Sequence, residues 1–355
     1  MLDFNTLVVI WFVLLGAQIA GYAVLDGFDL GVGVMLPIAR TEEGRGTFVR
    51  AIGPVWDGNE VWLITFGGTL LTAFPEAYAT IFSGFYVAFM ILLFALIFRA
   101  VSIEFRGKVH SAAWRRTLDG AFVVASIVAS LVFGIGAANA MLGVPLNARG
   151  IFVGSFLDLL GIGRHRHPTA YPLVIGLFTL AMFAMHGALY LNLKTPRGEL
   201  HERVRRSAWY AWVAFVFMYI IATAYTLTSV PRVHASFRAH HWALIAAVIG
   251  IAIEAAAIAN ISRAIYRRRP QQAFFSSAAA IIATVFLFGM TLWPMLVRAS
   301  NDPQYSWTAH RAASSRHTLM ILSIVACIGF PLALLYTATA YWTFRGRVRS
   351  EEPAY

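Results

Sequence analysis

Residues 53–68 read GPVWDGNEVWLITFGG, and they predict where a membrane helix begins. The Gly-Pro pair ends the preceding segment, because proline has no amide donor and a fixed φ. Asp57 then fits a helix N-cap, with Glu60 three residues later as in a capping box. From Val61 to Phe74 the chain is almost entirely apolar. The stretch therefore predicts a membrane helix whose first turn carries two carboxylates.

Two interpretations of Asp57 and Glu60 follow from this position. Both can serve only to cap the helix, or they can form a proton entry point. Carboxylates at a membrane boundary are costly unless they are partnered or hydrated, and they often mark ion paths. The residues by themselves leave both interpretations open. Trp56 and Trp62 flank the acids, and Trp62 lies too far inside the span to be typical of an interfacial aromatic belt.

The composition places the whole chain in a membrane. Its 355 residues are 59% hydrophobic and 13% charged, with a mean hydropathy of +0.68, whereas soluble domains are roughly 25% charged. Apolar runs of about 20 residues, enough to cross a bilayer, recur along its length. We therefore predict an all-α polytopic membrane protein. The net charge of +11 does not indicate nucleic-acid binding, because the basic residues lie in short loops between apolar runs.

We predict nine membrane spans in a single transmembrane domain, residues 1–346, followed by a short cytoplasmic tail, 347–355. The first span is long and is interrupted by DGFDLGVG, while the second and third are joined by a tight hairpin at Phe74-Pro75-Glu76. The predicted spans are 5–37, 52–74, 77–99, 117–138, 169–193, 207–229, 241–262, 273–297 and 317–343.

The lysines and arginines predict the orientation. Loops on one side of the nine spans carry 20 of them, counting Arg99, and loops on the other side carry 8. The richer side is cytoplasmic by the positive-inside rule, so the N-terminus lies outside and the C-terminus in the cytoplasm. Asp26, Asp29, Asp57 and Glu60 then gather toward the cytoplasmic side, and we group them as a candidate proton pathway.

Acids also lie deeper within predicted spans. Asp26 and Asp29 are three residues apart and share one helix face, and the Gly27–Gly31 pair allows close approach of another helix. They fit either a kinked, tightly packed helix end or a functional pair. Glu254 lies near the middle of the seventh span, where an unpaired carboxylate costs roughly 2.5–3.5 kcal/mol. It is therefore protonated, paired or turned toward a polar cavity, with no role assigned.

Histidine is the usual haem ligand, and His186 is the one histidine well inside a span. It has no partner at the same depth to complete a bis-histidine pair, so it is more typical of a packing or hydrogen-bonded residue. The C-x-x-C, H-E-x-x-H and P-loop motifs are absent from the sequence. We predict no metal ligands and no catalytic residues in this chain.

Several motifs together resemble subunit II of the cytochrome bd-type quinol oxidases. They are DGFDLGVG at 26–33, WDGNEVWLITFGG at 56–68, FSGFYVAF at 82–89 and FPLALLYTATAYWTFRGRV at 330–348. The resemblance implies two four-helix bundles plus one peripheral helix. It implies a complex of the bacterial cytoplasmic (inner) membrane that oxidises quinol and reduces oxygen to water. Such complexes generate proton-motive force by scalar proton uptake from the cytoplasm.

The resemblance also implies partners and roles. Haems b and d are expected in subunit I, the haem-bearing partner, and none is ligated by this chain. A bound structural quinone and small accessory single-span subunits are further candidates. Asp57 matches the family's proton-entry aspartate, and Trp62 matches a tryptophan at the mouth of an oxygen channel. Many relatives carry glutamine at the position of Glu60, and Glu254 has no usual counterpart in the family.

A proton-coupled secondary transporter is the alternative function, from a different class. It would use Asp26, Asp29, Asp57 and Glu254 to carry protons. Transporters of this kind are typically built from internal repeats whose broken helices meet near the bilayer midplane. The sequence contains no clear internal repeat. Co-purification with a haem-bearing membrane subunit would distinguish the two functions.

Overall fold

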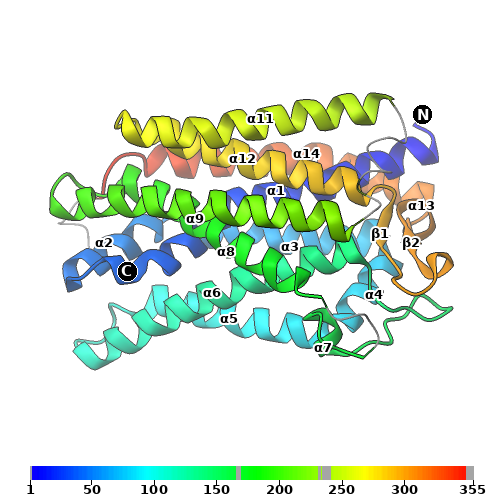
Figure 1. The fold of residues 1–355 in the computed structure, drawn as a ribbon, viewed down its shortest axis with the longest axis horizontal. Helices are drawn as coiled ribbons and strands as arrows, with labels where there is room; N and C mark the ends of the chain where they lie inside the picture. Colours follow the sequence, from blue (N-terminus) through cyan, green and yellow to red (C-terminus); the bar gives the residue numbers. More distant parts are fainter. Residues whose placement is uncertain (1, 165–168, 231–232, 234–240, 349–355) are drawn as a thin grey trace.

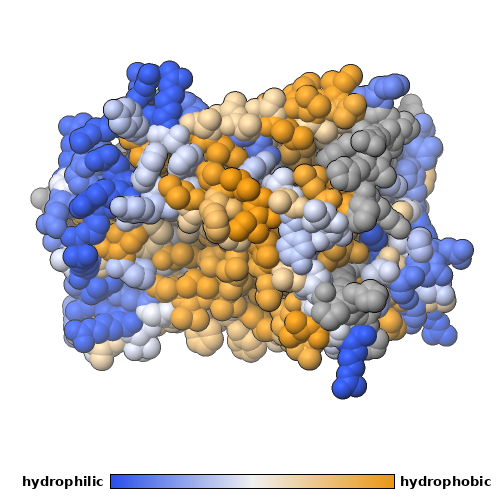
Figure 2. Space-filling model, in the orientation of Figure 1, coloured by the Kyte–Doolittle hydropathy of each residue, from blue (hydrophilic) through white to orange (hydrophobic). Residues whose placement is uncertain are grey.

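The computed structural model describes residues 2–164, 169–230, 233 and 241–348. Long helices run side by side along one axis (Figure 1). Figure 2 shows an apolar belt between two polar ends. This arrangement is the one that a bilayer requires, because helices satisfy their own backbone hydrogen bonds within the hydrocarbon layer.

The long helices form two groups of four and one outlier. The first group is α1 (Phe4–Met35), α3 (Trp56–Ala73), α5 (Tyr86–Phe105) and α6 (Ala112–Leu142). The second group is α8 (Tyr171–Lys194), α9 (Glu199–Ser229), α11 (His241–Tyr266) and α12 (Pro270–Leu292). The outlier is α14 (Arg316–Thr343). Short elements connect them: η1 (Leu36–Ile38), α2 (Glu42–Ile52), α4 (Pro75–Gly84), α7 (Phe156–Leu159), η2 (Pro303–Tyr305), α13 (Ala309–Ala312) and the antiparallel strands β1 (Met295–Val297) and β2 (Trp307–Thr308).

Helix contacts confirm the two four-helix bundles. In the second bundle α8 contacts α9 and α12, and α11 closes the ring by contacting α9 and α12. In the first bundle α1 contacts α3 and α6, and α6 contacts α5. An ion pair between Arg99 of α5 and Glu60 of α3 closes that ring. The bundles meet where α8 packs on α1 and α6, while α14 lies against α1 and α3.

Most of the predicted spans are confirmed. Among the described residues, eight helices are long and apolar enough to cross a membrane. The remaining predicted span, 52–74, corresponds to α3, which is shorter, at 18 residues, and carries two acids in its first half. The Phe74-Pro75-Glu76 hairpin is also confirmed, since α3 ends at Ala73 and α4 begins at Pro75.

Several predicted boundaries were wrong. The first span is not interrupted at Asp26–Gly33, because α1 stays helical through to Met35. The third span is two helices, α4 and α5, separated at Phe85. The eighth ends at Leu292 and continues as β1, and α2 was not predicted. Hydropathy cannot locate such breaks, because apolar residues continue across them.

Glycine lets α1 pack closely on α8 at DGFDLGVG. The Cα of Gly31 lies so close to the backbone of α8 at Phe183 and Gly187 that a Cβ there would overlap it. Gly187 in turn packs on the backbone of Gly31 and Val32. These glycines therefore provide close helix packing rather than a kink, which confirms the role expected of the Gly27–Gly31 spacing.

The α5–α6 and α11–α12 turns lie at the same end of the molecule as α2 (Figure 1), and the sequence of these connections is rich in arginine. There Arg106 binds both Asp119, at 2.6 Å, and Glu42, at 2.8 Å. Partial burial raises the pKa of Glu42, but hydrogen bonds from Arg45 and Arg106 outweigh it, so the pKa of this carboxyl lies below its ordinary value. Four residues of the predicted charge count lie outside the described residues: Arg166, Arg232, Arg238 and Arg349.

Candidate proton site

The site forms where α1 and α3 run antiparallel. Near one end of the pair, the side chain of Gln18 donates to the Thr69 hydroxyl at 2.9 Å. Near the other end, the Asn59 side chain donates to the carbonyl oxygen of Leu25 at 3.2 Å. This register brings the acids of DGFDLGVG beside the acids that begin α3. Residues some 30 positions apart in the sequence thus share one layer of the bundle.

Arg99 of α5 joins these acids. Its side chain is fully buried, and its Nη1 donates to both carboxylate oxygens of Asp26 at 2.7 Å. Its Nη2 donates to Glu60 Oε2 at 2.9 Å. The guanidinium also lies 6.0 Å from the centre of the Trp56 ring. Because a buried charge is stable only when paired and hydrogen-bonded, Arg99 and its two acids form one electrostatic unit.

The predicted loop position of Arg99 was therefore wrong. It lies six residues before the end of α5, inside an apolar run. Counting it with the loop residues treated a buried, ion-paired arginine as a marker of topology. The orientation is unaffected, because 19 basic residues still face 8 when Arg99 is left out of the count. An arginine within YVAFMILLFALIFRAV is itself a sequence feature that points to a site, because ionisable residues inside spans are costly and functional.

Asp29 is held by a second set of contacts. Its side chain is fully buried, and Oδ2 accepts a hydrogen bond from Asn59 Nδ2 at 2.7 Å. Asn59 Oδ1 accepts from the hydroxyl of Tyr341, on α14, at 2.9 Å. Asp29 Oδ1 has no hydrogen-bond partner among the described residues. Asn59 and Tyr341 were missed from the sequence, because neither neutral side chain stands out until the helices are packed.

Asp57 lies apart from this buried layer. Helix α3 begins at Trp56 with Val55 as its N-cap, and that N-cap makes no side-chain hydrogen bond. Asp57 is therefore in the first turn and is exposed. The predicted N-cap and capping box were wrong, because the helix starts one residue before Asp57. The acid still complements the positive end of the helix dipole.

The four predicted acids form a series of decreasing exposure. Asp57 is exposed, Glu60 is 21% exposed, and Asp26 and Asp29 are fully buried. Glu60 follows Asp57 by one helical turn, so the two share a face, and Glu60 contacts Arg99 directly. Half-buried Glu60 thus lies one turn from exposed Asp57 and in direct contact with the buried ionic layer.

Trp62 is half-buried in α3, two turns from its start. Its ring lies against Gly21 of α1, where a Cβ would overlap the ring. It meets Phe330 of α14 edge-on, with ring centres 5.8 Å apart. Trp62 therefore fills the seam between α1, α3 and α14, and its predicted role at an oxygen channel stays a prediction.

Glu254 is also buried, in the other bundle. It is 2% exposed, and its two carboxyl oxygens accept hydrogen bonds from Tyr219, at 3.0 Å, and Thr284, at 2.6 Å. Its partners come from α9 and α12, on either side of its own helix α11. Glu254 thus has hydroxyl partners, and it does not join the acids of the first bundle.

The structure gives His186 a role other than haem ligation. The side chain is fully buried, with Nδ1 2.7 Å from Ser277 Oγ and Nε2 3.0 Å from the carbonyl oxygen of Val24. Both ring nitrogens are thus engaged, so His186 does not fit a haem iron. The described residues contain no group of three His, Cys, Asp or Glu side chains arranged to hold a metal ion. His234 and His240 lie outside the described residues.

Comparison with known proteins now identifies the family. Residues 7–344 match the family described as cytochrome bd terminal oxidase subunit II. The chain belongs to this family. As a subunit II of that family with long apolar helices, it is a multi-pass protein of the bacterial cytoplasmic membrane.

Relatives match along almost their whole length. The chain is 31% identical, over 385 aligned positions, to the cytochrome bd-I ubiquinol oxidase subunit 2 of Escherichia coli (strain K12), covering 99% of this chain and 98% of that one. It is 30% identical to the cytochrome bd ubiquinol oxidase subunit 2 of Bacillus subtilis (strain 168), covering 97% of each. The bd oxidase structure from Geobacillus thermodenitrificans shares the fold, with a TM-score of 0.75, 17% identity, and coverage of 96% of this chain and 99% of that one.

Proposed function

We propose that this subunit II takes up protons from the cytoplasm for a quinol oxidase complex, through Asp57, Glu60 and the buried layer around Arg99. The observation that carries the proposal is the contact of half-buried Glu60 with fully buried Arg99. That contact joins the exposed first turn of α3 to Asp26.

The charges of the layer suit a proton relay. The carboxyl groups of Asp26 and Glu60 bind the Arg99 guanidinium, and Asp29 lies close enough for the charge of Arg99 to act on it. Two fully buried carboxylates and a half-buried one beside a single cation would leave excess negative charge, which is expensive in a medium of low dielectric constant. The layer is balanced best when it also holds protons. A proton collected by Asp57 can pass to Glu60, and from there to the carboxyl oxygens beyond Arg99.

The complex divides the chemistry between chains. The relatives are named as subunit 2 of ubiquinol oxidases, so we assign this chain a haem-bearing subunit I as its partner, with quinol and oxygen as substrates. Haems b and d of that subunit would supply electron transfer and oxygen reduction. The part of this chain that the structure describes holds no group of side chains arranged to bind a metal, and we assign its acids the supply of protons. Small accessory subunits and a quinone bound to this chain stay predictions.

Family membership favours this function over the proton-coupled transporter. A transporter would also have to couple Glu254 to the other acids. In the structure Glu254 contacts Tyr219 and Thr284 instead.

The test is Asp57→Asn in the intact complex, with quinol oxidase turnover measured per haem. The side chain does not cap α3, so the substitution removes a titratable group and about 0.3–1 kcal/mol of dipole interaction. We expect an assembled, haem-loaded complex with clearly reduced turnover. The matched control is Asp3→Asn, because Asp3 is an exposed acid at the other end of the molecule and caps α1, and asparagine caps as well as aspartate.

Normal turnover in Asp57→Asn would count against the relay unless Glu60 replaces the lost acid. The double variant Asp57→Asn, Glu60→Gln removes that possibility. If the double variant assembles and turns over normally, protons enter elsewhere.

A further inference from the structure

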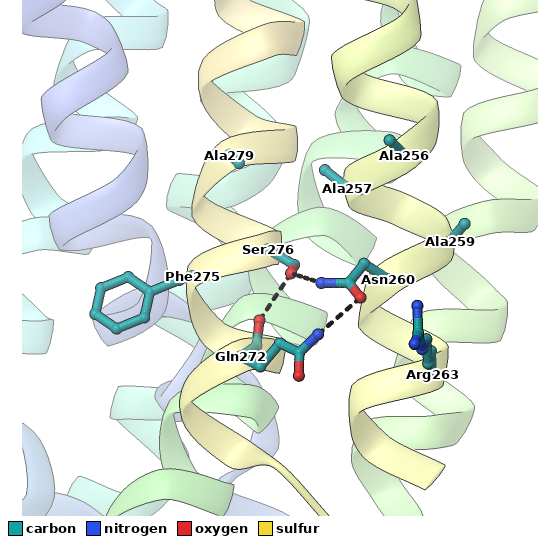
Figure 3. A pocket seen from close by; sticks show the side chains of 9 residues that line it. All are labelled: Ala256, Ala257, Ala259, Asn260, Arg263, Gln272, Phe275, Ser276 and Ala279. Carbon is teal, nitrogen blue, oxygen red and sulfur yellow. Dashed lines mark hydrogen bonds between the residues drawn. The ribbon is translucent and has the colours of Figure 1, made fainter. Parts of the chain in front are cut away.

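A groove lies between α11 and α12 in the second bundle, and none of its lining residues belongs to the proton site. It has a volume of about 640 Å³ and is open to the surroundings of the bundle. Figure 3 shows its lining, in which Asn260, Gln272 and Ser276 lie together and alanines extend along both helices. Arg263 lies one turn beyond Asn260 on α11. The groove combines a polar end with a smooth apolar one.

The polar end is a hydrogen-bonded cluster. Gln272 Nε2 donates to Asn260 Oδ1 at 2.9 Å, and Asn260 Nδ2 donates to Ser276 Oγ at 2.8 Å. Ser276 Oγ donates in turn to the carbonyl oxygen of Gln272 at 2.7 Å. The cluster fixes the two amide side chains in the groove, across the gap between the helices. Three half-buried polar groups on the outer face of a membrane bundle are stable only beside a polar neighbour, because hydrocarbon offers them no hydrogen bonds.

Their depth matches the edge of a bilayer. Asn260 lies six residues before the end of α11, so it is about 9 Å from the connecting turn at 1.5 Å per residue. Gln272 lies two residues after the start of α12. Ala256 and Ala279 lie deeper, about 14–15 Å from the turn on the same scale. The polar cluster is thus at headgroup level, and the alanines reach the hydrocarbon.

The charge around the polar end is positive. Arg263 is exposed, and Arg267, Arg268 and Arg269 follow in the turn. Arg268 forms an ion pair with Glu202 at 3.4 Å, and both side chains of this pair are exposed. This turn lies at the basic, cytoplasmic end of the molecule. Basic pockets between membrane helices on that side suit anionic lipid headgroups.

We propose that this groove binds an anionic phospholipid. Arg263 pairs with the headgroup phosphate, the amides of Asn260 and Gln272 hydrogen-bond to headgroup or ester oxygens, and one acyl chain lies along the alanines. A single-span helix could also use the alanines, because small residues allow close helix approach. We favour the lipid, because a helix does not need the polar cluster or the arginines at its edge.

The test measures lipid retained by the intact oxidase complex after exhaustive washing in mild detergent, by native mass spectrometry. Wild-type complex in phosphatidylglycerol nanodiscs should retain phosphatidylglycerol, and complex in phosphatidylcholine nanodiscs should retain little phosphatidylcholine. Arg263→Ala removes one charge-assisted contact and should weaken retention about tenfold. The matched control is Arg116→Ala, which removes the same charge from an exposed site in the first bundle.

A second variant, Ala279→Phe, fills the groove without changing charge and should also abolish retention. Equal loss in Arg116→Ala would overturn the proposal, because it would show a general effect of surface charge. Equal retention of phosphatidylcholine, unchanged retention in both groove variants, or a short hydrophobic polypeptide in place of lipid would each overturn it as well. The readout is lipid mass, so it is independent of proton uptake.

Discussion

The two four-helix bundles bury acids in different ways. In the first, Asp26 and Glu60 bind a fully buried arginine, and the ionic layer leads to exposed Asp57. In the second, Glu254 accepts hydrogen bonds from two hydroxyl groups. The same kind of side chain is thus partnered by a charge in one bundle and by neutral groups in the other.

This difference separates a structural role from a proposed proton role. Hydroxyl partners satisfy the carboxyl group of Glu254 without a counter-ion, so this acid joins α11 to α9 and α12 through neutral groups. In the first bundle the acids share one buried cation, and this is the layer that we propose carries protons. In the second bundle, polar groups hold neighbouring helices together, so this bundle supports the first one structurally. Four substitutions test this comparison.

Arg99→Gln should have the largest effect. It leaves Asp26 and Glu60 without their cation, and breaking a buried ion pair costs about 3–5 kcal/mol. We expect little assembled complex, or assembled complex with a much lower melting temperature and almost no turnover. The control Arg116→Gln changes an exposed arginine and should behave as wild type. Normal yield and turnover in Arg99→Gln would remove the ionic layer from the mechanism.

Asp26→Asn should have the next largest effect. The amide keeps the shape of the side chain but removes the charge facing Arg99, while Glu60 still pairs with the guanidinium. We expect a loss of about 1.5–3 kcal/mol, the value of a hydrogen bond to a charged group, and reduced turnover per haem. Thermal unfolding and oxidase assays measure the two effects separately. Reduced stability with full turnover would make Asp26 a structural anchor alone.

Trp62→Ala should have a smaller effect. Fully buried Trp→Ala changes cost about 3–5 kcal/mol, and Trp62 is only half-buried, so we expect clearly less. If the seam that it fills leads oxygen inward, the apparent oxygen affinity should change as well. Trp62→Phe serves as control, because it retains an aromatic ring against Gly21 and Phe330. An unchanged oxygen affinity in a normally assembled Trp62→Ala complex would leave Trp62 a packing residue.

Glu254→Gln should have the smallest effect. Glutamine keeps the size of a protonated glutamic acid and can retain its contact with at least one hydroxyl group, so the change should stay within about 0.5–1.5 kcal/mol. Assembly, melting temperature and turnover should be close to wild type. The matched comparison is Asp26→Asn in the first bundle. A strong loss of turnover in Glu254→Gln would give the second bundle a proton role and end the contrast.

The sequence predicted much of the fold because bilayer crossing depends on local composition. The lengths of the apolar runs located the helices and the Phe74-Pro75-Glu76 hairpin between two of them. The arginine-rich loops predicted the orientation of the chain in the membrane. The break at Phe85 and the strand after Leu292 were not predictable in this way, since both occur within apolar surroundings. The start of α3 was placed two residues late, because Asp57 fitted an N-cap position that Val55 occupies instead.

For the site, the sequence by itself determined which acids could carry protons, because Asp26, Asp29, Asp57 and Glu60 are expensive in or beside a bilayer wherever the chain places them. Only the tertiary structure decided what they face. Arg99 is far from Asp26 along the chain, and Tyr341 is farther still from Asn59. Such pairings depend on how the helices pack, so the sequence could mark Arg99 as unusual without showing which acids it binds, and it gave no sign that the neutral Tyr341 contacts Asn59.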